Sequence, residues 1–376
     1  MPFSSSFLIL FPFYRRLWYD KPIEKRGIDL MNIYGLTFSQ LEKYLLQTGE
    51  KPSKAPFIYK GLYQQQVDSL LELPAIRQSL KEKLHAVFTM EQPRLLAQTE
   101  SADTVKFLFA LQDNSLIEAV LMRQNYGNSL CISSQVGCNM ACAFCQSGRF
   151  KKVRSLQPEE LVTQVLFIQK HLRLKISNIV LMGIGEPFDN YDNVMRFLEI
   201  IQHPHGLALG PRHITVSTCG LVPQILQYAA HPAHGLLAIS LHAPDDETRS
   251  RLMPINRRYP VAQLMDAART CIRQTGKKVM LEYVMLQGIN DHPWQAQLLA
   301  DLIGTDDFHV NLIPYNETQN LGFTQSSRER ILAFYDILKK NKITVTMRRE
   351  FGSSVKAACG QLRADYEQSS KPEKGL

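Results

Sequence analysis

The sequence predicts an α/β protein: a partial (β/α)6 barrel of the TIM type, joined to a small N-terminal helical domain. From Ser129 onward, short β-rich segments alternate with helix-like segments, the pattern of parallel strands joined by crossover helices. Polar and cysteine-containing motifs follow the ends of successive strands, and the chemistry of a β/α barrel gathers at the carboxyl ends of its strands. A doubly wound sheet has the same alternation and is the alternative.

The composition is that of a folded protein and favours an anionic partner. Of the 376 residues, 45% are hydrophobic and 21% are charged, which excludes a disordered tail, a collagen-like repeat and a coiled coil. The 43 Lys and Arg residues exceed the 35 Asp and Glu residues, giving a net charge of +8. No segment approaches the ~20 apolar residues of a membrane span. We therefore expect a cytoplasmic protein without membrane association.

The chain divides into four predicted parts. Residues 1–30 read as a dispensable extension, because their apolar stretch is short, lacks the layout of a signal peptide and precedes a plausible alternative start at Met31. Apolar residues at helical spacing predict a helical accessory domain over residues 31–100, with one helix after Thr37 and another over Leu70–Leu84. The core barrel covers residues 101–365, and residues 366–376 form a C-terminal tail.

Strands and helices are expected in regular succession through the core. The predicted strands are Val105–Leu111, Leu116–Met122, Leu130–Ser133, Ile179–Met182, His213–Ser217, Leu236–Leu241, Val279–Met285 and His309–Ile313. The predicted helices are Pro158–Lys170, Asn190–Ile201, Leu221–Tyr228, Val261–Gln274, Trp294–Leu302 and Arg328–Lys340.

Three closely spaced cysteines are the main chemical motif. Cys138, Cys142 and Cys145 form a C-x3-C-x2-C pattern, and three thiolates on one loop can hold three corners of an iron–sulfur cluster while a fourth iron stays open. A zinc site of the Cys3His type that uses a distant histidine is the alternative. Cys219 and Cys271 are interpreted as structural residues, since free cysteine is most often a small buried side chain.

Three further segments narrow the interpretation of the cysteine motif. They are CISSQVGC at Cys131–Cys138, GIGEP at Gly183–Pro187 and AACGQL at Ala357–Leu362. Together with the cysteine spacing they resemble the RlmN/Cfr family of radical S-adenosylmethionine (SAM) methyltransferases, from about Glu118 to Leu362. That family methylates adenine in 23S rRNA, and some members also act on tRNA. The resemblance implies a radical SAM barrel, a 4Fe–4S cluster and SAM as cofactors, and an RNA-binding role for the accessory domain.

The same resemblance assigns binding residues. Cys138, Cys142 and Cys145 would hold the cluster. The residues expected to contact SAM stand in the GIGEP segment and after later strands: Gly185, Glu186, Ser217, Ser240, Leu241, His242 and Asn316. Gly183 and Gly185 would let the backbone approach the ligand closely.

The resemblance also implies three catalytic residues. Cys359 would be methylated by a first SAM, and a second SAM, cleaved by the reduced cluster, would give a radical that takes hydrogen from that methyl group. The carbon would then add to the adenine ring, and Glu118 would accept the ring proton. Cys131 would form a transient disulfide with Cys359 and so release the RNA. Transient catalytic disulfides are compatible with a reducing cytosol.

The implied activity is methylation of carbon-2 of an adenine in 23S rRNA, and possibly of tRNA, with two SAM consumed per methylation. The expected partners are this RNA and an electron donor such as flavodoxin or ferredoxin, and the expected state is a monomer. Carbon-8 methylation, which confers ribosomal antibiotic resistance, is one alternative. A non-catalytic zinc- and RNA-binding protein is an alternative from another class.

Two sets of residues bear on the target RNA. Four cations follow the cysteines and are candidates for phosphate binding: Arg149, Lys151, Lys152 and Arg154. The pairs Arg257–Arg258 and Arg348–Arg349 add to them. Departures from the family pattern leave the target RNA and ring position open, namely Ile184 for the usual Met, Val355 and Lys356 before Ala357, and the segment Gln146–Phe150.

Overall fold

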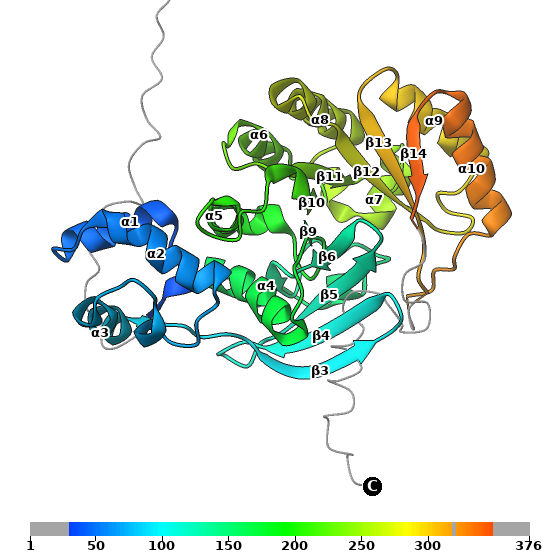
Figure 1. The fold of residues 1–376 in the computed structure, drawn as a ribbon. Helices are drawn as coiled ribbons and strands as arrows, with labels where there is room; N and C mark the ends of the chain where they lie inside the picture. Colours follow the sequence, from blue (N-terminus) through cyan, green and yellow to red (C-terminus); the bar gives the residue numbers. More distant parts are fainter. Residues whose placement is uncertain (1–29, 318–320, 349–376) are drawn as a thin grey trace, which may run out of the picture.

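A computed structural model describes residues 30–317 and 321–348 and is built around one open sheet of ten strands (Figure 1). Seven of these strands run parallel: β6 (Gly127–Cys131), β9 (Asn178–Leu181), β10 (Ile214–Thr218), β11 (Leu236–Ser240), β12 (Val279–Met285), β13 (Phe308–Pro314) and β14 (Thr344–Met347). Three antiparallel strands extend the sheet beyond β6: β3 (Arg94–Glu100), β4 (Thr104–Ala110) and β5 (Leu116–Gln124).

The strand order decides between the two predicted architectures. Along the sheet the order is β3, β4, β5, β6, β9, β10, β11, β12, β13 and β14, so each strand lies beside its predecessor within this sheet. A doubly wound sheet reverses direction at a switch point and carries helices on both faces. No reversal occurs in the described residues, and the two edge strands, β3 and β14, do not pair with each other. The fold is a partial barrel, as predicted, and the doubly wound alternative is wrong.

Helices cover the outer face of the barrel. In chain order they are α4 (Pro158–Leu172), α5 (Tyr191–Gln202), α6 (Val222–Ala230), α7 (Asp246–Leu252), α8 (Val261–Thr275), α9 (Pro293–Ile303) and α10 (Arg328–Lys340). Their boundaries follow local sequence: α4 starts at Pro158 with a capping box between Gln157 and Glu160, and α8 stops at Gly276, whose φ of 63° suits glycine.

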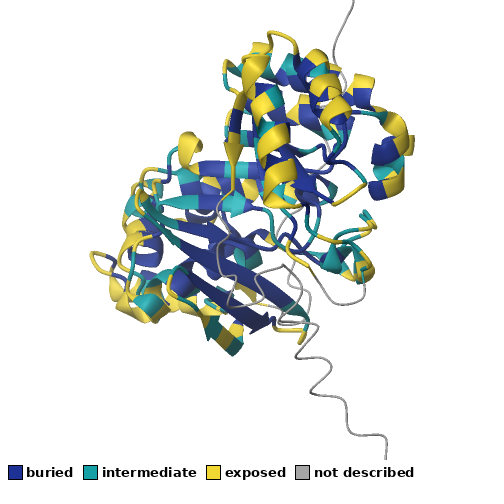
Figure 2. Cartoon of the chain, turned by 90° about the vertical axis from the view of Figure 1, so that its right-hand side faces the viewer, coloured by how far each residue is buried: buried dark blue, intermediate teal, exposed yellow. Residues whose placement is uncertain are grey.

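Side chains along each strand point alternately toward the helices and toward the inner face of the barrel. On β5 the side chains of Ile117, Ala119 and Leu121 join the main hydrophobic core beneath the helices. Val120 and Met122 point the other way and belong to a small separate cluster with Cys131. Because successive side chains of a strand alternate, Glu118 shares their face. Strands β4 and β5 are buried along much of their length (Figure 2), which explains their nearly continuous apolar sequence.

The N-terminal domain is helical and packs on the barrel. It contains α1 (Phe38–Gln47), α2 (Ala55–Tyr59), α3 (Gln78–Val87) and the short parallel pair β1 (Met31–Asn32) and β2 (Phe88–Thr89). Thr37 caps α1 in a capping box with Gln40. Gln64 donates hydrogen bonds to the Pro204 and Gly206 carbonyls, and Asp68 pairs with Lys170 of α4. One continuous core runs through both parts.

The structure departs from the expected elements in several respects. The helix predicted over Leu70–Leu84 starts only at Gln78, since Pro74 interrupts the run. Strand β3 lies within the range 31–100 and pairs with β4. Neither helix α7 nor strand β14 is predicted from the sequence.

Among the described residues, no helix is both long and apolar enough to cross a bilayer.

Candidate active site at the carboxyl ends of the strands

The three motif cysteines lie on one loop, which we call the cluster loop, residues 137–153. A short antiparallel pair, β7 (Gln135–Val136) and β8 (Arg154–Ser155), closes its base. Gly137 has a φ of +76°, and a Cβ there would lie 2.2 Å from the Lys151 carbonyl oxygen, so the loop needs glycine at this point. The Ala143 amide donates to the Leu252 carbonyl oxygen at 2.9 Å. The loop is therefore fixed both at its base and against the end of α7.

The chemistry of the three thiols fits an iron–sulfur cluster. Burial raises the pKa of Cys138 to about 12 and that of Cys142 well above its ordinary value, and the charges of all three cysteines influence one another. The thiols of Cys138 and Cys142 thus stay protonated until metal cations displace the protons. In residues 30–317 and 321–348, no three His, Cys, Asp or Glu side chains are arranged to hold a single metal ion.

The glycines of the GIGEP segment are required by the chain's own packing. Gly185 has a φ of +110°, and a Cβ on it would lie 2.6 Å from the Gln135 Cβ. A Cβ on Gly183 would lie 2.6 Å from the Ile132 carbonyl oxygen. The space beside both glycines is filled by the segment that leads into the cluster loop. Close packing of two backbone segments is therefore one reason for glycine at both positions, and approach of a ligand to this segment stays a prediction.

Glu186 is a buried carboxylate that joins two strand ends. Its Oε1 accepts from the Phe188 amide at 3.0 Å, and its Oε2 accepts from the Cys219 amide at 2.8 Å. Burial raises the pKa of Glu186, and the two amides and Thr218 oppose that shift. A carboxylate has about four lone-pair positions. The Cys219 and Thr218 side chains also hydrogen-bond to this carboxylate, and binding of the SAM ammonium group by Glu186 stays a prediction.

The other predicted SAM contacts lie at the same end of the sheet. Ser217 is buried near the end of β10, Ser240 ends β11, and Leu241 is fully buried just beyond it. Asn316 is exposed on the loop after β13. The structure brings these positions to one edge of the barrel together with Glu186, as parallel strands require.

His242 adopts a left-handed backbone conformation with φ of +58°. Its Nδ1 accepts from the Val284 amide at 3.1 Å, so Nε2 carries the proton of the neutral ring. Burial, aided by the Arg249 charge, lowers the pKa of His242 to about 3. The ring meets Phe144 edge to face at 4.8 Å, between two of the motif cysteines. His242 is thus a neutral hydrogen-bond donor held against the cluster loop.

Two catalytic residues implied by the resemblance lie on the same inner face. Cys131 on β6 pairs with Val120 on β5, and Glu118 lies two residues along β5. Both side chains are buried. Such diagonal neighbours are roughly 7–8 Å apart. Cys359, the predicted disulfide partner of Cys131, lies outside the described residues, so the disulfide stays a prediction. Cys219 and Cys271 are free and buried, as expected of structural cysteines.

Sequence reasoning missed two buried cations at the site. Arg249 of α7 is 0% exposed and binds backbone carbonyls at two strand ends. Lys106 of β4 is 2% exposed and pairs in register with Val120, on the inner face that carries Glu118. Lys106 could have been recognised, because it is a single cation in a strand of mostly apolar residues. Nothing in the sequence marks Arg249 as buried, because helix α7 is not predicted.

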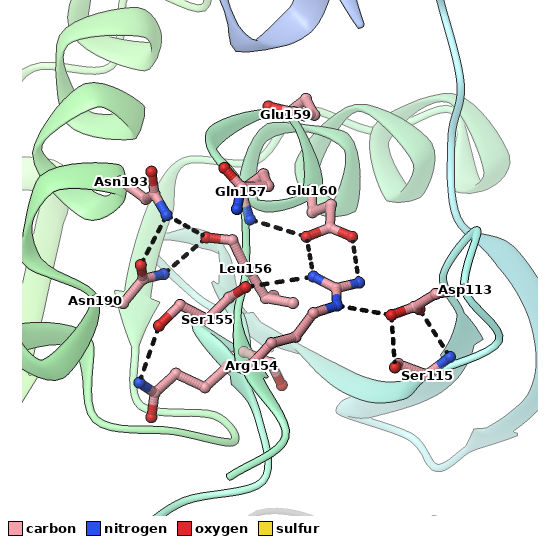
Figure 3. Close-up of polar contacts among 12 residues, drawn as sticks. Asp113, Ser115, Arg154, Ser155, Leu156, Gln157, Glu159, Glu160, Asn190 and Asn193 are labelled. Atoms are coloured by element: carbon pink, nitrogen blue, oxygen red, sulfur yellow. Dashed lines mark hydrogen bonds and ion pairs between the residues drawn. The ribbon is translucent and has the colours of Figure 1, made fainter. Parts of the chain in front are cut away.

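The cations after the cysteines are partly engaged by the protein itself. Lys152 pairs with Asp189 at 2.8 Å. Arg154 pairs with Glu160 through two nitrogens and with Asp113 through Nε, each at 2.7 Å (Figure 3). These two residues stabilise the fold, which weakens their case as phosphate ligands. Arg257 and Arg258 are exposed and line an open cavity of about 420 Å³ beside residues 139–141 of the cluster loop.

Comparison with known proteins agrees with this geometry. The family model of the radical SAM superfamily matches residues 132–300, and that of the ribosomal RNA large subunit methyltransferase N-terminal domain matches residues 31–90. Probable dual-specificity RNA methyltransferases RlmN are similar along nearly their whole length. The protein from Geobacillus kaustophilus is 46% identical over 92% of this chain and 97% of its own. The protein from Acholeplasma laidlawii is 45% identical over 89% and 99%.

A solved structure gives the same result for the fold. The crystal structure of a radical SAM methyltransferase from Sphaerobacter thermophilus superimposes with a TM-score of 0.83, at 38% identity, over 88% of this chain and 98% of that one. The family models, the superimposed fold and the loop with the three cysteines all indicate the same family. The chain belongs to the RlmN family of radical SAM methyltransferases, whose cofactors are a 4Fe–4S cluster and SAM.

Proposed function

We propose that this enzyme methylates carbon-2 of an adenine in 23S rRNA and in tRNA, by way of a methyl group carried on Cys359. The observation that carries the proposal is the placement of Glu118 and Cys131 as buried diagonal neighbours on the inner face of the sheet. A base and a thiol are thereby available on one surface, at the same end of the sheet as the cluster loop. The relatives are named as dual-specificity RNA methyltransferases, which supports two RNA substrates.

When bound, the cluster and SAM supply the radical chemistry that a weakly nucleophilic ring carbon requires. The chain's residues supply the carrier, the base and the release step. Cys359 receives a methyl group from one SAM and presents its carbon to the adenine, and a second SAM is consumed in activating that carbon. Glu118 accepts the proton that leaves the ring carbon. The Cys131 thiolate then attacks the Cys359 sulfur, which forms a disulfide and breaks the carbon–sulfur bond to the RNA. The electron pair of that bond stays with the carbon, which takes up a proton and remains on the ring as the methyl group.

The surroundings of the site support an RNA substrate. Arg257 and Arg258 line the open cavity beside the cluster loop, where a phosphate backbone can bind. The N-terminal domain is held on α4 next to the barrel and offers a second surface. We further propose that the enzyme is a cytoplasmic monomer supplied with electrons by a flavodoxin or ferredoxin.

Mass spectrometry of RNA tests the substrate. We expect 2-methyladenosine in 23S rRNA and tRNA from cells that have the gene, its loss on deletion, and its return when the gene is restored. Methylation at carbon-8 in place of carbon-2 would support the resistance-type activity. Unchanged methyladenosine at every position would contradict the proposal, and a colourless protein that binds only zinc would contradict any radical mechanism.

Cysteine variants test the carrier. Cys359→Ala should lose methylation entirely, because no thiol can hold the methyl group. Cys131→Ala should retain RNA covalently, visible as a nuclease-sensitive band of high mass on a denaturing gel, because the release step is missing. Cys271→Ala, at a buried cysteine of α8, is the matched control and should stay active. Full activity of Cys359→Ala would refute the methyl-cysteine route.

A further inference from the structure

Arg249 is the largest fully buried side chain in the described residues, and it lies beneath the cluster loop. Its exposure is 0%. Nε donates to the Leu241 carbonyl at 3.1 Å, Nη2 donates to the carbonyls of Cys219 at 2.7 Å and Ser240 at 3.2 Å, and Nη1 donates to Asn256 Oδ1 at 2.8 Å. The guanidinium therefore joins the ends of β10 and β11 to the segment after α7.

All four of these acceptors are neutral. Within residues 30–317 and 321–348, no carboxylate lies within ion-pair distance of Arg249. Asp246 makes no ion pair with it, and its Oδ1 accepts from Asn256 Nδ2 at 2.9 Å, although the Asp246 charge does act on Arg249 from that distance. A buried charge is costly unless an opposite charge compensates it. Arginine cannot avoid that cost by losing its proton in the physiological range.

The charges that act on Arg249 are those of Cys219, Cys142 and Asp246, and Cys142 is a motif cysteine of the cluster loop. The charges of Arg249 and Cys142 influence each other, as do those of Arg249 and Cys219. Leu252 lies three residues after Arg249, at the end of α7. Its carbonyl accepts from the Ala143 amide at 2.9 Å, which ties the helix to the cluster loop between two motif cysteines. Thiolates that ligate iron carry negative charge at this position.

We propose that Arg249 is the internal counter-charge of the 4Fe–4S cluster and sets its reduction potential. The inference rests on the cluster assigned to Cys138, Cys142 and Cys145. Adding an electron makes a cluster more negative, and a fixed buried cation stabilises that reduced form. Net charge and hydrogen bonding are among the factors that set iron–sulfur potentials. Arg249 thereby makes the cluster easier to reduce.

Arg249 acts through charge, not contact with the cofactor. Four hydrogen bonds to protein acceptors occupy most of its five N–H donors. The planar guanidinium is also fixed in place, because it binds carbonyl groups at the ends of both β10 and β11. Arg249 is therefore a positioning residue, and its charge can be altered without altering any ligand of iron.

A charge swap separates the electrostatic role from a structural one. In Asp246→Asn/Asn256→Asp the net charge of the chain is unchanged, and an amide–carboxylate hydrogen bond between the two positions can form in the opposite direction. A carboxylate then faces the Arg249 Nη1, which was 2.8 Å from the Asn256 oxygen. The negative charge, which in the wild type acts on Arg249 from Asp246, is thereby expected in direct contact with the guanidinium. Arg249→Gln removes the charge directly, and Arg249→Lys keeps it.

The measurement is a redox titration of the anaerobically reconstituted proteins, followed by electron paramagnetic resonance. For the swap and for Arg249→Gln we expect the ratio of reduced to oxidised cluster at a given potential to fall about tenfold, a negative shift of about 59 mV for one electron. Arg249→Lys should retain most of the wild-type potential, even if its thermal stability falls. Iron and sulfide content per chain show that each protein is loaded.

Two results would overturn the proposal. One is a swap variant that is fully loaded and titrates at the wild-type potential. The other is an Arg249→Lys variant that shifts as far as Arg249→Gln, which would indicate that hydrogen bonding alone matters. Neither readout involves RNA. A wrong substrate assignment would leave these potentials unaffected, so the two proposals fail separately.

Discussion

His242 shows how one residue at the mouth of the barrel depends on its surroundings. A non-glycine residue with φ of +58° costs on the order of 1–3 kcal/mol, which the hydrogen bond from Val284 and the contact with Phe144 help to offset. The Asn290 side chain donates to the His242 carbonyl at 2.7 Å and so holds the same turn. The result is a neutral imidazole presented beside the cluster loop.

This environment gives a testable pH dependence. The pKa of His242 is about 3 in the folded chain and about 6.5 when unfolded, so below pH 6.5 the unfolded chain takes up a proton that the folded chain refuses. The free energy of unfolding therefore falls as the pH drops, by about 1.4 kcal/mol per pH unit. Urea unfolding of the cluster-free protein should show a contribution of about 2 kcal/mol from this residue between pH 7 and pH 5.

His242→Asn is the matched variant for this measurement. Asparagine tolerates the left-handed conformation, and its side-chain oxygen can accept from the Val284 amide, but it does not titrate. The variant should lose about 2 kcal/mol less stability than the wild type between pH 7 and pH 5. Equal losses in both proteins would show that His242 is not the titrating group.

Sequence reasoning located residues whose chemistry depends on spacing and missed those whose role depends on burial. The three cysteines, Glu186 and the Ser240–His242 segment stand in short patterns next to strand ends, so their positions could be predicted. Arg249 and Lys106 are chemically ordinary in the sequence. Their importance comes from being 0% and 2% exposed, and burial of a single cation depends on elements far along the chain.

The strand pair that closes the cluster loop is held by one arginine. Arg154 of β8 binds Glu160 at the start of α4 and Asp113 in the turn between β4 and β5, and its Nη1 also donates to the Ser155 carbonyl (Figure 3). The guanidinium thus joins β8 and the start of α4 to the turn between β4 and β5, 41 residues away in the sequence. Bidentate geometry makes such a pair stronger than an ordinary surface ion pair.

Arg154→Met should therefore lower the free energy of unfolding by about 1–2 kcal/mol, because two partly buried carboxylates lose their partner. Denaturant unfolding of the cluster-free protein measures this. Lys151→Met is the control, since Lys151 is exposed and makes no ion pair in the described part of the chain. A loss of the same size in both variants would indicate that the general positive charge, not the Arg154 pairs, is what stabilises the loop.

The regular elements of the barrel were predictable and the short ones were not. Strand β12 and helix α10 have the bounds that the sequence predicts, and the other core elements differ by only a few residues. Helix α7 has only 7 residues, too few for a clear helical period. Strand β14 has 4 residues, with a single buried side chain, so its apolar signal is weak. Whether such short elements form depends on their contacts with distant parts of the chain, and not on local sequence preference.

Binding of the cluster is expected to stabilise the whole molecule. A ligand that binds only the folded chain raises its stability in proportion to the logarithm of its concentration over Kd. The cluster loop is bonded to β8 at its base and to α7 at its tip, so this stabilisation extends to the barrel. We expect Tm to fall by several degrees when a chelator removes iron under anaerobic conditions.

Cys142→Ala provides the control for iron removal, because it lacks one ligand and should show no change of Tm with chelator. A wild-type Tm that is insensitive to iron would contradict the expected coupling.

The alternation of strands and helices predicted the α/β class, but it could not distinguish a barrel from a doubly wound sheet. That distinction depends on which strands pair, and pairing is not visible in local periodicity.

The order of the ten strands has a consequence for how the protein is made. From β3 to β14 every strand of the main sheet pairs with the one synthesised just before it in that sheet. As the chain leaves the ribosome, each new strand meets an edge that is already formed, and no early strand has to wait for a late one to be inserted beside it. The sheet can grow in a single direction during translation, with short chain separations between partners keeping the entropy cost of each addition small.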